Sequence, residues 1–132
     1  MCVKNVKRGD VYYAYLPERE GSSAQYGIRP VLCIQNNCVT RNSPTVIVAA
    51  ITSQIKRLDL RTHVLLPEVE GLPRESMVEA EQRFTLGMRD LLQYRCTLDD
   101  ATMRRVHRAV RFSEKKDGMT YRQRYRKGRK RK

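Results

Sequence analysis

Long apolar runs and tryptophan are both absent from this chain of 132 residues. No stretch of about 18 apolar residues occurs, which excludes a membrane-spanning helix. The N-terminal MCVKNVKRGD also lacks the apolar centre of a signal peptide. We therefore expect a cytoplasmic protein that has no membrane partner. The length suits a single domain, and 40% of the residues are hydrophobic, which is enough for a buried core.

Cysteine and histidine are too few and too scattered to indicate a metal site. The four cysteines lie at positions 2, 33, 38 and 96 without a Cys-x-x-Cys pair, and there are two histidines. Structural zinc sites take four such ligands at close spacing, so we expect no metal and no cofactor. Cys33 lies within an apolar run, which is typical of a small core residue.

The common catalytic motifs are missing as well. The sequence has no Walker A loop, no G-x-G-x-x-G, no H-E-x-x-H and no G-x-S-x-G. His63 and His107 could supply the base and acid of a nuclease, but nothing in the sequence brings them together. The pair Glu79 and Glu81 is equally unspecific, because most carboxylates at protein surfaces are only solvated.

Acidic residues are scarce, at 14 against 27 Lys and Arg, and the net charge is +13. Residues 115–132 contain ten Lys or Arg and one Asp, so this segment alone carries +9. Such a run seldom folds by itself. We divide the chain into a domain at residues 1–114 and a flexible basic tail at 115–132. The tail is either a solvated end or an arm that binds phosphates, with tyrosines that could stack on bases.

Short β-forming segments fill the first two thirds of the chain. The segment TVIVAAIT at 45–52 is nearly all apolar and β-branched, which predicts a central strand buried on both faces. The expected strands are residues 10–16, 30–36, 45–52, 62–66 and 76–85. Two helices are expected after them, at 87–95 and at 97–116, with Thr97 as the N-cap of the second. This order predicts a mainly β fold, a small bent barrel or sandwich, with a C-terminal helix.

Arg29 and Thr52 form the most specific pair of candidate residues. Arg29 precedes Pro30 at the start of one predicted strand, and Thr52 ends the next long strand. Consecutive antiparallel strands place the start of one beside the end of the next. An arginine fork and a hydroxyl near a loop rich in Gly and Ser make a plausible phosphate site.

A series of short motifs runs in a fixed order along residues 6–114. They are RGDV at 8–11, G-x-R-P-V at 27–31, IQNN at 34–37, SPTVIVAAIT at 43–52, THV at 62–64 and EQ at 81–82. Together they resemble the MazF/PemK family of toxin endoribonucleases. Three features depart from that family's pattern. Arg-Phe-Thr at 83–85 replaces a common Ile-Arg-Thr segment, the loop between Gly21 and Arg29 is about one residue longer, and the tail after Glu114 has no counterpart.

The resemblance implies a compact SH3-like barrel with a C-terminal helix, assembled as a homodimer. It implies the toxin of a type II toxin–antitoxin system, which cleaves single-stranded RNA, often messenger RNA, without a metal. In this reaction the 2′-hydroxyl attacks the adjacent phosphate and leaves 2′,3′-cyclic phosphate and 5′-hydroxyl ends. The expected protein partner is a MazE-like antitoxin that blocks the RNA groove.

The resemblance also implies roles for individual residues. The positions that match the catalytic ones are Arg29 and Thr52. Contacts to RNA are expected from Ser22, Ser23, Gln25, Tyr26, His63 and Gln82. Arginine has a pKa above about 12 and is a poor general base, so whether Arg29 moves a proton or only stabilises charge stays open.

Two other functions remain as alternatives. The first is a nucleic-acid-binding module without catalysis, and the presence of both Arg29 and Thr52 argues against it. The second is a toxin directed at a topoisomerase, as in the related CcdB family. The RPV and AAIT motifs argue against this second function.

Overall fold

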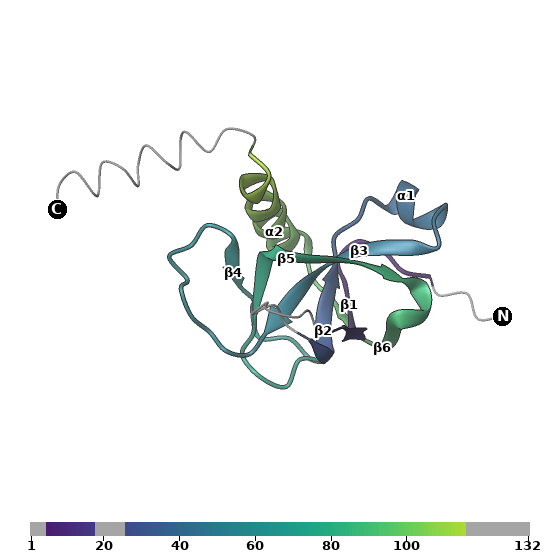
Figure 1. The fold of residues 1–132 in the computed structure, drawn as a ribbon. Helices are drawn as coiled ribbons and strands as arrows, with labels where there is room; N and C mark the ends of the chain where they lie inside the picture. Colours follow the sequence, from purple (N-terminus) through teal and green to yellow (C-terminus); the bar gives the residue numbers. More distant parts are fainter. Residues whose placement is uncertain (1–4, 18–25, 116–132) are drawn as a thin grey trace.

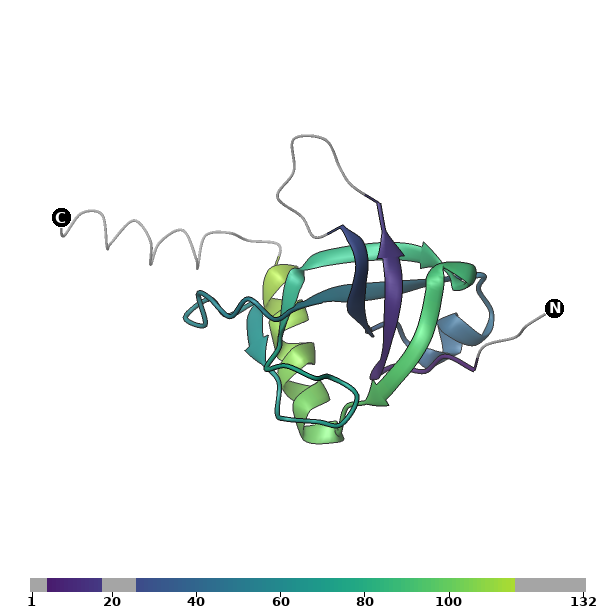
Figure 2. The same cartoon turned by 90° about the horizontal axis from the view of Figure 1, so that it is seen from below.

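The strands of the protein form one curled antiparallel sheet. The computed structural model describes residues 5–17 and 26–115. The strands are β1 (Asp10–Leu16), β2 (Gly27–Cys33), β3 (Thr45–Thr52), β4 (His63–Leu65), β5 (Met77–Gly87) and β6 (Leu91–Thr97). Their order in the six-stranded sheet is β4-β5-β3-β2-β1-β6. The sheet curls strongly into a small barrel-like shape, with helix α2 (Asp100–Ser113) along its side against β4 and β5 (Figures 1 and 2). The predicted fold class, mainly β with a C-terminal helix, is confirmed.

Two apolar clusters hold the barrel and the helix together. The first fills the barrel interior and includes Leu16, Val31 and Val48. The second lies between the sheet and α2, where Met103, Val106 and Ala109 pack against the other face of the strands. Strand β3 contributes to both clusters, because alternate residues of a strand point to opposite faces. The prediction of a central strand buried on both faces is therefore correct.

A bulge interrupts the pairing of β5 with β3. Ala49 lies opposite Arg83, whereas the next residue, Ala50, lies opposite Glu79. Residues 80–82 of β5 are thus left out of this ladder, and the amide of Ala80 donates instead to the carbonyl of Thr62, at 2.8 Å. Bulges bend a strand and redirect its side chains, so this one helps β5 to curl around the barrel.

The helix predicted at residues 87–95 is wrong. Only Met88–Asp90 form a single 3₁₀ turn, and the chain then continues as β6. Strand β6 pairs with β1, where Ala14 lies opposite Leu91 and Leu91 is buried in the barrel. Pairing with the neighbouring strand β1 overrides the local helical pattern, because propensity is only a weak preference.

Several element boundaries also differ from the prediction. Strand β2 begins at Gly27 rather than Pro30, and a short helix α1 (Asn37–Arg41) occupies a segment expected to be a loop. The N-cap of α2 is Asp99, whose Oδ1 accepts a hydrogen bond from the amide of Thr102 at 2.8 Å. Thr97, the predicted cap, ends β6 and donates its hydroxyl to Asp10 at 2.8 Å.

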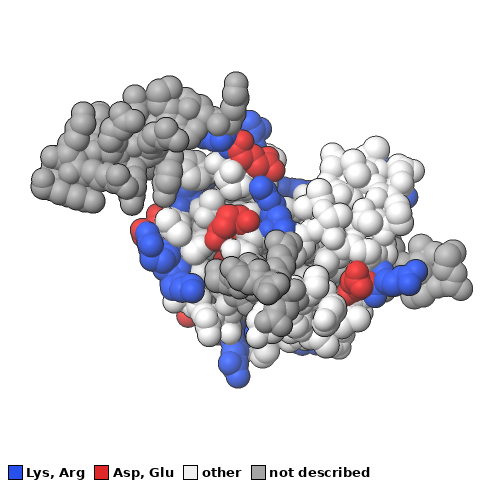
Figure 3. Space-filling model, in the orientation of Figure 1, with Lys and Arg blue, Asp and Glu red and all other residues white. Residues whose placement is uncertain are grey.

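No helix within the described parts of the chain is both long enough and apolar enough to cross a membrane. Basic and acidic side chains are interspersed over the face of the molecule drawn in Figure 3. On that face the described residues form no continuous basic stripe.

Candidate functional site

A pocket of about 320 Å³ lies where β2 begins and β3 ends. Its walls come from β1, β2, the end of β3 and the segment before β5. The lining residues are Tyr13, Arg29, Pro30, Ile51, Thr52, Ser53, Leu72, Pro73, Arg74 and Ser76. Arg29 and Thr52, the pair predicted from strand order, are both among them.

The register of the sheet explains why Arg29 and Thr52 meet. Val31 of β2 lies opposite Ala50 of β3 in an antiparallel ladder. Continuing this register by two residues on each strand sets Arg29 opposite Thr52. Directly opposed residues point to the same face of an antiparallel pair, so both side chains serve the same pocket.

The guanidinium of Arg29 is fixed by a hydrogen bond from one of its nitrogens. Its Nε donates a hydrogen bond to the carbonyl oxygen of Tyr26 at 2.9 Å. No other hydrogen bond links this guanidinium to the described residues. The terminal nitrogens keep their N–H donors in a planar fork, the geometry that holds two oxygens of a phosphate.

Thr52 is buried, with 7% of its surface exposed. Its Oγ1 accepts a hydrogen bond from the amide of Gln54 at 3.1 Å. Because the oxygen is the acceptor in that bond, the hydroxyl proton stays available for donation to a ligand. The preceding residue, Ile51, lies in the cluster between the sheet and α2 and fixes the end of the strand.

Among the described residues, the lining of the pocket is positively charged. Arg29 and Arg74 belong to it, and none of its other described members is Asp or Glu. The guanidinium of Arg95 lies 5.1 Å from the ring centroid of Tyr13, another lining residue, and holds that ring by a cation–π contact. This combination of two cations, hydroxyls and an aromatic ring suits a ligand with phosphate groups.

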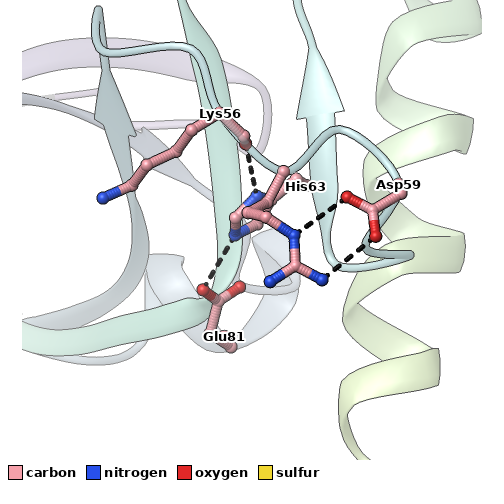
Figure 4. Close-up of polar contacts among 5 residues, drawn as sticks. Lys56, Asp59, His63 and Glu81 are labelled. Carbon is pink, nitrogen blue, oxygen red and sulfur yellow. Dashed lines mark hydrogen bonds and ion pairs between the residues drawn. The ribbon is translucent and has the colours of Figure 1, made fainter.

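His63 lies outside this pocket and is engaged by protein groups. Its Nδ1 lies 3.1 Å from the carbonyl oxygen of Lys56, and its Nε2 lies 3.1 Å from Oε2 of Glu81 (Figure 4). Only 4% of the His63 side chain is exposed. The ring therefore links the segment before β4 to the bulge of β5.

One group of side chains has the composition of a metal site. Ligand atoms of His63, Glu79 and Glu81 lie within 4.8 Å of one another. Imidazole and carboxylate groups can bind divalent ions. The bond between His63 and Glu81 already joins two of the three groups without an ion, and the cluster is separate from the pocket that contains Arg29.

Comparison with known proteins identifies the family. A protein-family model described as PemK-like, MazF-like toxin of type II toxin-antitoxin system matches residues 7–113. The chain belongs to this family. The resemblance indicated by the motifs is thereby confirmed.

Individual relatives agree with this family assignment. Endoribonuclease EndoA of Bacillus subtilis is 46% identical over 109 residues, covering 82% of this chain and 93% of its own length. Endoribonuclease MazF of Staphylococcus saprophyticus is 41% identical over 109 residues, covering 82% and 90%. A solved structure of a mycobacterial endoribonuclease in complex with its cognate antitoxin aligns with a TM-score of 0.66 at 26% identity, over 80% of this chain and 91% of that one.

None of the other residues predicted to contact RNA in this MazF-like toxin is among the described residues that line the pocket. Tyr26 is 49% exposed beside Arg29, so its ring is accessible to a base. Gln82 is half-buried in the bulge of β5 and does not line the pocket. Ser22, Ser23 and Gln25 lie outside the described residues.

Sequence reasoning missed Arg74, Ser53, Ser76 and Tyr13 as residues of the toxin's pocket. Thr52 lies opposite Met77 at the start of β5, so the segment just before β5 runs beside the end of β3. The strand-order argument that joined Arg29 to Thr52 would have found Arg74 if it had been extended to this third strand.

Proposed function

We propose that this toxin is a metal-independent endoribonuclease that cleaves single-stranded RNA, including messenger RNA, at short sequence motifs. The meeting of Arg29 and Thr52 in one positively charged pocket is the observation that carries the proposal. The two curated relatives named endoribonucleases support it.

The reaction is an internal transfer at one phosphate of the RNA. The 2′-oxygen forms a bond to phosphorus, and the bond from phosphorus to the 5′-oxygen of the next nucleotide breaks. One proton leaves the 2′-hydroxyl and one is added to the leaving 5′-oxygen. The products are a 2′,3′-cyclic phosphate and a 5′-hydroxyl, and no cofactor takes part.

Arg29 and Thr52 stabilise the charge that this attack builds on the phosphate oxygens. The terminal nitrogens of Arg29 hold two oxygens, and the hydroxyl of Thr52 donates one more hydrogen bond. Loss of one such donor typically costs about 2.7–4 kcal/mol, or roughly 100- to 1000-fold in rate. Arginine retains its proton at neutral pH, so we assign the proton transfers to water or to the RNA itself.

The contacts around the pocket follow from this chemistry. Tyr26 stacks on a base next to the cut, and Ser22, Ser23 and Gln25 bind phosphates or bases from the preceding loop. Gln82 reads a base from the bulge of β5. His63 has an indirect role. Its hydrogen bond with Glu81 stabilises the bulge of β5.

We also propose that the toxin works as a cytoplasmic homodimer that a MazE-like antitoxin inhibits. A structural neighbour is described as an endoribonuclease in complex with its cognate antitoxin. Residues 1–114 form the toxin domain in this proposal. The basic tail at 115–132 acts as an additional phosphate-binding arm.

The test is to incubate the purified protein with a long RNA in EDTA and to map the new ends. We expect cuts at a short recurrent motif, with cyclic phosphate on one side and 5′-hydroxyl on the other. The same preparation carrying Arg29→Ala should leave the RNA intact. Binding of RNA without any cleavage would contradict the proposal, and poisoning of a topoisomerase would favour the CcdB-like alternative.

A further inference from the structure

Arg74 reaches the pocket from the side opposite to Arg29. The strand order places β3 between β5 and β2. Arg29 belongs to β2, Thr52 ends β3, and Arg74 lies just before the start of β5 at Met77, which is opposite Thr52. Thr52 therefore lies between the two arginines along the sheet.

The segment that carries Arg74 is fixed on both sides. Before it, Leu72 is buried at 8% exposure, and the carbonyl of Gly71 accepts a hydrogen bond from Nε of Arg95 at 2.9 Å. After it, the hydroxyl of Ser76, itself buried, donates to the carbonyl of Arg74 at 2.9 Å. The backbone at Arg74 is thus tied to the core and to β6, although its side chain is exposed.

No charge in the described structure explains this position of Arg74. Its guanidinium forms no ion pair or hydrogen bond with a described residue, and none of the described residues that line the pocket has a carboxylate. Exposed arginines commonly pair with nearby carboxylates, as Arg57 does with Asp59 at 3.0 Å. A second cation at the edge of an uncompensated pocket favours an anionic ligand with more than one charged group.

The distance between β2 and β5 favours contacts of Arg29 and Arg74 with different phosphates. Neighbouring strands lie about 4.8 Å apart, so β2 and β5 are roughly 10 Å apart. Arg29 and Thr52 are adjacent and together suit one phosphate. The volume of about 320 Å³ is at the lower end of the range of about 300–1,000 Å³ typical of ligand pockets. It thus has room for a nucleotide and not only for a phosphate group.

We propose that Arg74 binds the phosphate next to the one that is cleaved and so positions the RNA in the pocket. The inference rests on the proposed endoribonuclease function, which it extends to a second phosphate contact. Arg74 acts mainly on substrate binding, because the charge on this neighbouring phosphate is the same in the substrate and in the transition state.

The experiment uses a short RNA that contains the mapped cleavage motif. The full-length protein is compared with Arg74→Ala, Arg74→Lys and the control Arg105→Ala, which removes an exposed arginine of α2 that lines none of the described pockets. Arg74→Ala should raise KM about tenfold and leave kcat within about twofold. Arg74→Lys should recover part of the loss, because lysine keeps the charge without the fork.

Binding of an uncleavable RNA gives a second readout. A 2′-deoxynucleotide at the cut removes the attacking hydroxyl and leaves all phosphates in place. For Arg74→Ala the slope of log affinity against log salt should fall by about 0.7, the value for one phosphate contact on a single strand. A neutral methylphosphonate at the neighbouring phosphate should weaken binding by the wild type and leave Arg74→Ala unaffected.

The outcomes separate this inference from the function on which it rests. If the wild type cleaves and Arg29→Ala does not, but Arg74→Ala matches Arg105→Ala in KM and salt slope, only the role of Arg74 is overturned. A fall in kcat without a change in KM would also overturn it, since Arg74 would then act on the reacting phosphate. If the wild type cleaves no RNA, the proposed function itself fails.

Discussion

Arg29 and Thr52 line the same pocket from adjacent strands, with their side chains on one face of the sheet. Neither residue is a member of a familiar catalytic triad, and arginine is a poor base at neutral pH. Their pairing makes sense for a reaction in which the substrate supplies the nucleophile. The protein then has only to hold the phosphate and stabilise its developing charge.

Replacement of Gly71 by alanine should destabilise the fold. Gly71 has φ +105, and a Cβ there would meet the carbonyl oxygen of Arg95. Gly27→Ala is the matched control, since Gly27 has φ +85 but no atom of the described residues lies within 4 Å of the added Cβ. Backbone strain of about 1–3 kcal/mol affects both variants, and only Gly71→Ala adds the clash. Thermal unfolding should therefore give Gly71→Ala the lower Tm, and equal Tm values would contradict the contact with β6.

Asp99 should matter for stability through its hydrogen bond at the start of α2. Hydrogen bonds from Thr102 lower the pKa of Asp99. A lowered pKa in the folded state means that this stabilisation is present above the ordinary value of 3.8 and is lost as pH falls through the folded value. Asp99→Ala should lower Tm at neutral pH, and its difference from wild type should shrink as pH falls through the folded pKa, which lies below 3.8.

The control for this prediction is Asp99→Asn, because asparagine keeps an oxygen that can accept the bond from Thr102. Its Tm at neutral pH should lie between those of the wild type and Asp99→Ala, because asparagine accepts the bond without the charge. If Asp99→Asn is as unstable as Asp99→Ala, the charge rather than the cap is what stabilises the helix.

The cysteines should differ sharply in reactivity. Burial raises the pKa of Cys33 to about 12, and this residue is 1% exposed in the barrel core. Cys38 is exposed on α1. Since the thiolate is the reactive form, iodoacetamide near pH 8 should modify Cys38 and leave Cys33 intact until the protein is unfolded. Peptide mapping by mass spectrometry before and after unfolding measures this, and early labelling of Cys33 would contradict its burial.

The basic tail should contribute to binding without specificity. Removal of residues 115–132 takes away ten basic side chains. If the tail binds phosphates, the slope of log affinity against log salt should fall by about 0.7 for each phosphate that the shortened protein no longer binds, while the cleavage motif stays the same. An unchanged slope would show that the segment is only a solvated end.

The sequence predicts those parts of this toxin that depend on local pattern. The segment TVIVAAIT is nearly all apolar and β-branched, which favours a buried strand, and the order of antiparallel strands placed Arg29 beside Thr52. The segment GMRDLLQYR has no such constraint. Its conformation is decided by pairing with β1, which lies far away in the sequence.

The parts of the site that were missed depend on irregular backbone. The bulge at residues 80–82 cannot be seen in the sequence period, and it holds Gln82, which was predicted to contact RNA but does not line the pocket. Arg74 lies in a connection whose path is fixed by the burial of Leu72 and by a bond from Arg95. Such contacts join distant positions, so the periodicity of one strand or helix cannot reveal them.

The most direct test of the account is the single-turnover cleavage rate of Thr52→Val and Arg29→Ala on one RNA. Valine keeps the shape of Thr52 and removes the hydroxyl, while Arg29→Ala removes the fork. Each rate should fall roughly 100- to 1000-fold relative to wild type, with Arg105→Ala unchanged and the folded spectra of all four proteins alike. Wild-type rates in both pocket variants would contradict the assignment of this pocket as the site of cleavage.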